Sequence, residues 1–434
     1  MSAPSAPSAP SAPSAPSAPS APSAPSAPSA SSASSVAKPP PFDPGDPLGL
    51  DDLLEPEDLA IRDTVRTWAA DRVLPHIAEW YERGELPVIR ELARELGGLG
   101  ALGMSLTGYG CAGATAVQYG LACLELEAAD SGIRSLVSVQ GSLAMYAIHR
   151  FGSEEQKRRW LPGMAAGEII GCFGLTEPDH GSDPAGMRTH AKRDGTDWVL
   201  NGRKMWITNG SVAGVAVVWA RTDESSPSGP AIRGFLVPAG TPGFSAPEIT
   251  HKWSLRASVT SELVLDDVRL PADAVLPEVI GLRGPLSCLS HARYGIVWGS
   301  MGAARASFEA ALQYARTREQ FGRPIGGFQL TQAKLADMAL ELHKGILLAH
   351  HLGRRMDAGR LRAEQISFGK LSNVREAIEI CRTSRTVLGA NGISLEYPVM
   401  RHATNLESVL TYEGTVEMHQ LVLGKALTGL DAFR

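Results

Sequence analysis

Cysteine is scarce in this sequence, and the few cysteines show no pattern. The chain has five among 434 residues, an odd number, and no two form a Cys-x-x-Cys pair. This argues against a disulfide framework or a zinc site, and we expect no bound metal. It is typical of the reducing cytoplasm, which is the predicted compartment. The cysteines are Cys111, Cys123, Cys172, Cys288 and Cys381.

Two other absences exclude whole classes of protein. No uncharged apolar run reaches the length that spans a bilayer, so we expect a soluble protein with no membrane partner. The formal net charge is −5, which gives no indication of a nucleic-acid partner. By contrast, 44% of the residues are hydrophobic, and the length suffices for two or three domains.

The chain begins with a low-complexity segment. Residues 2–28 are uninterrupted Ser-Ala-Pro triplets, and no charge appears before Lys38. Repeated proline fixes φ and removes amide donors, so we predict a disordered, solvated tail over residues 1–44. The segment is neither an arginine-rich presequence nor a secretory signal, and a tether or an accident of coding explains it best.

Helical periodicity follows the tail. Apolar residues keep near-helical spacing from Glu55 to Leu96, and further helices are predicted over Ala114–Ala129 and Ser138–Phe151. The run Gly98–Gly103 matches G-x-G-x-x-G, but a dinucleotide-binding fingerprint must follow a strand. Because this run follows a helical pattern, we interpret it as a helix end.

After Gly171 the period changes to two. Asn201-Gly202 between short apolar runs predicts a β-hairpin with a type I′ turn. Further strands are predicted over Val215–Ala220, Gly234–Val237 and Glu262–Leu265. Strands without intervening helices indicate an antiparallel β domain.

Long helical patterns return from Pro285 and indicate a four-helix bundle. The fold class is therefore α+β, with helical, β and helical parts in that order. The predicted domains are 45–171 (α-helical), 172–284 (antiparallel β) and 285–434 (four-helix). The predicted bundle helices are Ala292–Arg316, Gln329–Asp357, Ala363–Leu388 and Thr415–Leu427.

Four segments could support chemistry. Exposed amides around Gly181 and Ser182 could bind a pyrophosphate, although an ordinary loop has about even odds. Trp206 offers a flat face and Thr208 a hydroxyl, but a core tryptophan is the usual alternative. Arg318 suits a diphosphate, or merely ends a helix in solvent. Glu413, beside Tyr412 and a glycine, could be a buried base.

Together these segments resemble the acyl-CoA dehydrogenase family of flavoproteins, in order, over residues 45–434. The resemblance implies an α-helical domain, a β domain and a four-helix domain, a homotetramer, and FAD as cofactor. Arg318, Gln329 and Thr386–Ala390 would reach the flavin of a neighbouring subunit. The motifs are Leu175–Pro178 with Gly181–Asp183, Trp206–Thr208, Arg318 with Gln320–Gly322, Leu388–Gly392 and Tyr412–Thr415. The implied cofactor residues are Phe173, Leu175, Thr176, Gly181, Ser182, Trp206, Ile207, Thr208, Arg318, Phe321, Gln329, Thr386, Leu388, Gly389, Ala390, Thr415 and Glu417.

The resemblance also places the catalytic residues. Glu413 falls on the family's base, which must be dry and well aimed to remove the α-proton of a thioester. Some members take the base from another helix, at the position before Arg293, which here is Ala292 and cannot act.

The acyl group is indicated by Glu127, Arg134 and Ser135, which resemble the glutaryl-CoA dehydrogenase subfamily. A fixed guanidinium suits a substrate tail that ends in a carboxylate, whereas an interhelix salt bridge is the alternative. Two departures are Ile133, where an aromatic residue is familiar, and Asp179-His180 in the flavin loop. The implied substrate-binding residues are Glu127, Arg134, Ser135, Ser182, Leu286, Arg293, Gly414 and Phe433.

The resemblance thus implies oxidative decarboxylation of glutaryl-CoA to crotonyl-CoA and carbon dioxide, in lysine or tryptophan degradation. Tyr412 resembles the decarboxylating members, and electron-transfer flavoprotein would accept the electrons. Three alternatives stay open: a short-chain acyl-CoA dehydrogenase acting on monocarboxylic substrates without decarboxylation, an acyl-CoA oxidase, and a catalytically silent scaffold.

Overall fold

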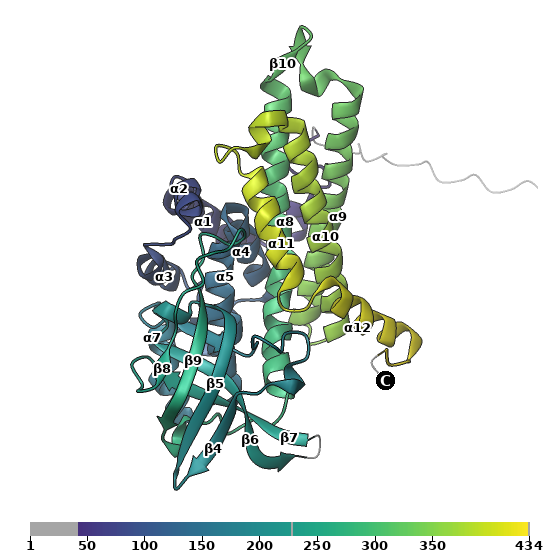
Figure 1. Ribbon diagram of the computed structural model, residues 1–434. Coiled ribbons are helices and arrows are strands. Elements are labelled where there is room, and N and C mark those ends of the chain that lie inside the picture. Colours follow the sequence, from purple (N-terminus) through teal and green to yellow (C-terminus); the bar gives the residue numbers. More distant parts are fainter. Residues whose placement is uncertain (1–41, 227–228, 433–434) are drawn as a thin grey trace, which may run out of the picture. The chain divides into compact units, whose positions relative to one another are not determined.

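The computed structural model describes residues 42–226 and 229–432. The chain divides into two units, Met1–Pro47 and Leu48–Arg434. Nearly all of the predicted tail lies outside the described residues, as does Phe433. The second unit contains every helix and strand named below (Figure 1).

Helices make up the first part of the second unit. Helix α4 starts on a capping box in which Thr115 accepts a bond from the Gln118 amide. The prediction for Ser138–Phe151 was too short, because Asp130 caps a helix that already begins at Ser131. Gly98–Gly103 follows a helix, as predicted. The helices are α1 (Pro56–Arg72), α2 (Ile77–Arg83), α3 (Ile89–Gly98), α4 (Ala116–Ala129), α5 (Ser131–Ser138), a π-helical stretch (Val139–Met145), α6 (Tyr146–Phe151) and α7 (Glu154–Ala165).

A seven-stranded sheet follows, in the order β3-β6-β4-β5-β9-β8, with β7 beside β6. The prediction of a purely antiparallel domain was wrong in detail, because β3 and β4 pair with β6 in parallel. The strands are β3 (Gly171–Gly174), β4 (His190–Asp194), β5 (Asp197–Thr208), β6 (Val215–Ser226), β7 (Gly229–Pro238), β8 (Phe244–Ser245) and β9 (Thr260–Leu270).

The predicted hairpin at Asn201-Gly202 was wrong. Strand β5 runs straight through that dipeptide, and the pairing with β9 shifts register there, which is a β-bulge. The turn lies instead at Gly195, where φ is +64°, between Asp194 and Asp197. Asn-Gly satisfies the backbone needs of a bulge as well as those of a tight turn, so sequence could not separate the two.

The last part is a helical bundle. Helices α9 and α10 were predicted with the bounds found, and the predicted helix Thr415–Leu427 is α12. Helix α8 begins nine residues before its predicted start at Ala292, and α11 was not predicted. In Figure 1, α11 lies against the bundle and α12 projects away from it. The elements are α8 (Arg283–Thr317), α9 (Gln329–Asp357), α10 (Ala363–Leu388), α11 (Val399–Thr411) and α12 (Val416–Thr428), with small hairpins β1–β2 (Thr107–Gly108, Cys111–Ala112) and β10–β11 (Glu319–Gln320, Arg323–Pro324).

One hydrophobic core joins the first helices to the sheet and to α8. It includes Leu126 on α4, Trp219 on β6 and Trp298 on α8, all nearly inaccessible to solvent. Burial of such large side chains is the main source of stability and fixes α4 and α5 against α8. The five cysteines are free. In the residues that the structure describes, no helix has the length and apolarity needed to cross a membrane.

Candidate active site

The turn between α11 and α12 holds the predicted base. Glu413 has φ of +53° and Gly414 has φ of +105°. Left-handed backbone at a residue with a side chain costs of order 1–3 kcal/mol and persists only where the surroundings hold it. The turn ends at Thr415, whose hydroxyl accepts a bond from the Met418 amide and caps α12.

Glu413 is half-buried, but its carboxyl oxygen Oε2 is inaccessible to solvent and has no hydrogen-bond partner among the described residues. Burial raises the pKa of this carboxyl, while the charges of Arg293, Arg134 and Lys370 oppose the rise. A carboxyl with a raised pKa and an unengaged oxygen suits proton transfer near neutral pH.

An ion pair lies beside this turn. Arg134 on α5 donates its Nε–H to Glu127 Oε2 on α4 at 2.7 Å, and the two side chains are 2% and 0% exposed. Ser131 donates to the other oxygen of Glu127 at 2.8 Å. Arg134 also donates from Nη2 to the Tyr412 hydroxyl, with its guanidinium 5.7 Å from the ring centre.

Gly299 on α8 makes room for this ion pair. A Cβ atom at that position would lie 2.1 Å from Glu127 Oε2 and 3.3 Å from Arg134 Nε. Those distances are shorter than van der Waals contact allows, so the absence of a side chain at 299 is what lets the pair approach the bundle.

The predicted substrate residues gather here only in part. Arg293 donates to the Glu413 carbonyl at 2.5 Å. Ser135 follows Arg134 on α5, and its buried Oγ has no hydrogen-bond partner within the described part of the chain. Leu286 is 40% exposed, two helical turns before Arg293 on α8. Ser182 lies in an exposed loop of the middle part.

The predicted cofactor loop is held from beneath by a buried lysine. Lys204 on β5 donates to Glu177 Oε1 at 2.8 Å and to the Leu175 carbonyl at 3.1 Å. Glu177 also accepts the amides of Arg188 and Thr189. Burial lowers the pKa of Lys204 to about 8, although Glu177 opposes the shift. Glu177 therefore organises the loop instead of facing solvent.

Met205 connects this loop to the neighbouring strand by donating to the Thr176 carbonyl at 2.9 Å. Next to it, Trp206 has φ of +64° and is 60% exposed, at an irregularity in the β5–β9 pairing. The core-tryptophan alternative for Trp206 is therefore wrong. Ile207 is buried, and Thr208 is partly accessible. An exposed indole beside a hydroxyl and backbone carbonyls fits the flat, polar-edged ring of a flavin.

Gly181 does not adopt positive φ, and a Cβ atom there would meet nothing within 4 Å, so the loop does not depend on a glycine at this position. The bend comes from Glu177 and His180, whose backbone groups bond to each other at 3.1 and 3.2 Å. Phe173 is buried against Trp219 below the loop.

We expect Lys204→Met to lower the free energy of unfolding by about 3–5 kcal/mol, because it leaves Glu177 buried without its cation. Chemical denaturation of the flavin-free protein measures this directly. The matched control is Arg203→Met in the same strand, which breaks an ion pair with Glu262 whose arginine is 64% exposed. That control is expected to cost at most about 1 kcal/mol. Equal losses for the two variants would contradict the role of Lys204.

The other predicted cofactor residues lie far from this loop within one chain. Helix α8 has 35 residues, so its ends are separated by roughly 50 Å. The sheet lies near its start, and β10 lies beyond its end (Figure 1). At that far end Asn391 bonds to Tyr314 at 3.0 Å, and Phe321 is 94% exposed. The far-end group is Arg318, Phe321, Gln329, Thr386, Leu388, Gly389 and Ala390. Thr415 and Glu417 belong instead to the first turn of α12.

Lys370 was missed by sequence reasoning. It is buried on α10 and donates to the carbonyls of Tyr412 and Gly414. A signal did exist, because Lys370 lies on the helical stripe of Ile366, Asn373 and Val374, which otherwise faces the core.

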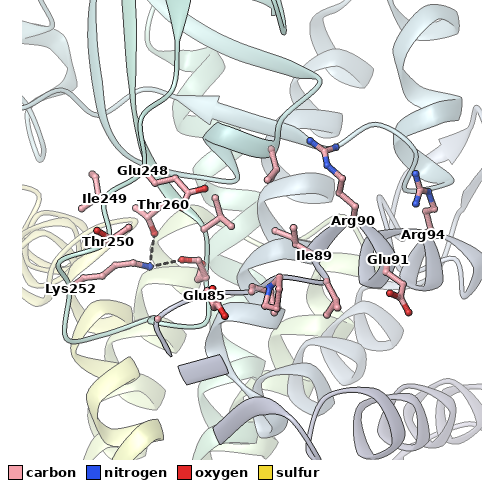
Figure 2. Close-up of a pocket in the computed structure, with 17 residues that line it drawn as sticks. Glu85, Ile89, Arg90, Glu91, Arg94, Glu248, Ile249, Thr250, Lys252 and Thr260 are labelled. Atoms are coloured by element: carbon pink, nitrogen blue, oxygen red, sulfur yellow. Dashed lines mark hydrogen bonds between the residues drawn. The ribbon is translucent and has the colours of Figure 1, made fainter. Parts of the chain in front are cut away.

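A separate cavity of about 480 Å³ lies between the α2–α3 connection and the loop before β9 (Figure 2). Its lining mixes apolar residues with charged ones, among them Arg90, Arg94 and Glu248. Lys252 is engaged there by Thr260 at 3.0 Å and by the Ser258 carbonyl. None of the predicted site residues lines this cavity. Among the described residues no cluster of three or more His, Cys, Asp or Glu could hold a metal ion.

Three family models match the chain in succession. They are described as the N-terminal, middle and C-terminal domains of acyl-CoA dehydrogenase, and they match residues 55–168, 172–268 and 280–428.

Known proteins agree with these models. A crystal structure of glutaryl-CoA dehydrogenase from Mycobacterium smegmatis is 70% identical, with a TM-score of 0.87 over 90% of this chain and 99% of that one. A second structure of a glutaryl-CoA dehydrogenase from the same organism, in complex with FADH2, is 62% identical, with a TM-score of 0.88 over 91% of this chain and 100% of that one. The human mitochondrial short-chain specific acyl-CoA dehydrogenase is 34% identical over 83% of this chain and 87% of its own length.

Proposed function

This chain belongs to the acyl-CoA dehydrogenase family, with FAD as its cofactor, and we propose that it oxidises and decarboxylates glutaryl-CoA to crotonyl-CoA and carbon dioxide. The proposal rests on the buried ion pair of Arg134 and Glu127 beside the Tyr412 hydroxyl. The 70% identity to a glutaryl-CoA dehydrogenase supports it.

Arg134 has capacity left for a substrate carboxylate. Of its five N–H donors, the one on Nε and one on Nη2 are used, which leaves three. Burial raises the pKa of the Tyr412 hydroxyl, which keeps its proton available for donation. A monocarboxylic acyl tail would leave these donors unmatched in a dry site, at a cost in binding. We therefore assign Arg134, Tyr412 and Ser135 to the distal carboxylate, with Glu127 holding Arg134.

Glu413 is the base that we assign to the first step. Its carboxylate removes the proton from the carbon next to the thioester, and Oε2 is available for this because it bonds to none of the residues that the structure describes. FAD, when bound, supplies the acceptor for the hydride that leaves the adjacent carbon. Loss of carbon dioxide then leaves a dienolate conjugated with the thioester. The carboxyl of Glu413 returns its proton to the end of that dienolate and becomes a carboxylate again.

The residues that would hold FAD form two groups. Phe173–Ser182 and Trp206–Thr208 form one, and the far-end group forms the other. Roughly 50 Å of helix separates the groups in one chain, so we propose that the far-end group serves a neighbouring subunit in a homotetramer. Thr415 and Glu417, close to the base, would contact the flavin as well. We propose that the domain boundaries lie at 171/172 and 284/285.

The cellular setting is part of the same proposal. Electron-transfer flavoprotein would take the electrons, the compartment would be the cytoplasm, and the substrate would come from lysine or tryptophan degradation. Five free thiols are compatible with a reducing compartment.

Mixing the purified, flavin-containing protein with glutaryl-CoA and an artificial electron acceptor tests the proposal. We expect flavin bleaching and release of one carbon dioxide for each substrate oxidised. Sedimentation of the same sample tests the tetramer. Butyryl-CoA is the comparison substrate, because its tail lacks the carboxylate that Arg134 would bind.

Each alternative has its own outcome. Faster bleaching by butyryl-CoA, without carbon dioxide, would favour the short-chain activity that the human relative's name describes. Rapid peroxide formation without an added acceptor would favour an oxidase. Protein that binds no flavin at all would contradict every enzymatic function.

A further inference from the structure

Three consecutive carbonyl groups at the turn are bound by cationic side chains. Lys370 on α10 donates to the carbonyls of Tyr412 and Gly414, and Arg293 on α8 donates to the carbonyl between them. A carbonyl bonded to a buried cation is held more strongly than one bonded to a neutral donor. The turn is thus fixed by its backbone from two different helices.

This arrangement explains how the unusual backbone persists. The carbonyls at 412 and 414 flank the left-handed residue Glu413, and both can reach Lys370 only while that residue keeps its conformation. Because the Glu413 side chain takes no part, its Oε2 atom stays unengaged. The direction in which the carboxyl points is therefore set by Lys370 and Arg293, which bind the backbone of the turn.

The charge of Lys370 also acts on the base. The charged and titratable groups that face Glu413 are Lys370 on α10, Arg293 on α8, Arg134 on α5 and His419 on α12, together with the Tyr412 phenol. Burial lowers the pKa of Lys370, whereas the negative charge of the ionised Glu413 carboxylate opposes the shift and favours the charged ammonium. Burial likewise lowers the pKa of His419 to about 3, so His419 contributes no charge at neutral pH.

We propose that Lys370 is a positioning residue that holds the Tyr412–Gly414 turn and, through its charge, keeps the Glu413 carboxyl ionisable. The inference rests on the proposed function only in taking Glu413 as the base. The clamp on the backbone is a property of the chain alone and can be measured without any substrate.

The first measurement is amide hydrogen exchange in the holoenzyme. Lys370→Met removes both hydrogen bonds while keeping the length of the side chain, and Lys370→Gln, which keeps a donor, takes its place if the first variant does not fold. We expect amide exchange in peptides covering residues 411–415 to accelerate by about tenfold or more, because the turn loses the two hydrogen bonds from Lys370 and opens more often. Peptides from the start of α10 should exchange as before. Lys334→Met, an exposed lysine on α9, is the control and should change neither region.

The second measurement is the pH dependence of flavin reduction, with whichever acyl-CoA reduces the unaltered enzyme. Lys370→Met should lower kcat by about 10–100-fold, because a small displacement of the base from the substrate proton slows proton transfer. It should change KM by less than about twofold. The acid limb of kcat should move up by about one pH unit, because the carboxyl loses a neighbouring positive charge. Lys370→Gln, which keeps a donor but no charge, should recover part of kcat without restoring the pH midpoint.

Different outcomes would contradict the role of Lys370 and the proposed substrate. Unchanged exchange at 411–415 together with an unmoved pH midpoint would overturn the role of Lys370, even if the rate fell. Absence of flavin reduction by glutaryl-CoA, with butyryl-CoA active, would overturn the proposed substrate and leave the tests of Lys370 intact.

Discussion

Glu413→Gln is expected to lower the rate of flavin reduction by glutaryl-CoA by about 10³-fold, while the protein keeps its flavin. The amide has nearly the shape of the carboxyl but cannot take a proton, and general base catalysis typically contributes 10²–10⁴-fold. The backbone clamp does not use the side chain, so the turn should keep its conformation. Stopped-flow absorbance of the bound flavin measures both the rate and the flavin content.

Glu407→Gln is the matched control, because Glu407 is an exposed glutamate on α11 that pairs with Arg382. It should leave the rate within about twofold of the unaltered enzyme, as surface ion pairs contribute little. In the unaltered enzyme kcat should rise with pH through the raised pKa of Glu413, because only the ionised form accepts a proton. A Glu413→Gln enzyme that still reduces flavin at more than a tenth of the normal rate would mean that another group is the base.

The double variant Glu127→Gln/Arg134→Met is expected to lower kcat/KM for glutaryl-CoA by about 10²–10³-fold. The distal carboxylate would lose its charged partner, and truncating one side of a buried charge pair costs about 3–5 kcal/mol. Changing both residues matters, because Arg134→Met alone would leave Glu127 buried without a cation and confuse misfolding with lost binding. Steady-state kinetics on glutaryl-CoA and butyryl-CoA measure the discrimination.

Butyryl-CoA is the internal control for the double variant, and its kcat/KM should fall by less than about fivefold, or rise, since an apolar pocket suits an apolar tail. The control protein is Glu341→Gln/Lys344→Met, which removes an exposed ion pair from α9. Parallel loss on both acyl-CoAs would show that Arg134 and Glu127 support the fold rather than recognise the substrate.

The sequence predicted element types well wherever the periodicity was long. Helices α9 and α10 were placed at Gln329–Asp357 and Ala363–Leu388, as found. Helix α11 was missed because it follows Pro398 closely and its buried face includes Arg401, His402 and Asn405, which break the apolar pattern. Those polar residues are accommodated by long-range partners, such as Asp130 for Arg401 and Asn405, that no local pattern reveals.

The candidate site was likewise predicted only in part from the sequence. The motifs predicted that Glu413, Arg134 and Glu127 share one site, and in the structure they lie in one region, with Arg134 bonded to Glu127 and to Tyr412, the neighbour of Glu413. The hydrogen-bond partners of Lys370 and Lys204 could not be predicted, because each lysine bonds to carbonyls more than 25 residues away in sequence. Residue type alone favours an exposed lysine, and although the helical stripe of α10 indicated that Lys370 is buried, it did not indicate what Lys370 binds.

Gly299 limits which residues can occupy the position of Glu127. Any side chain at 299 would collide with Glu127 Oε2, so the acidic residue and a larger residue at 299 exclude each other. A chain without the ion pair could carry a larger residue at 299, and it could regain Glu127 in its present position only after 299 became glycine again. The effects of changes at 127 and 299 are therefore expected to be non-additive, and a double-mutant cycle between the two positions would measure their coupling.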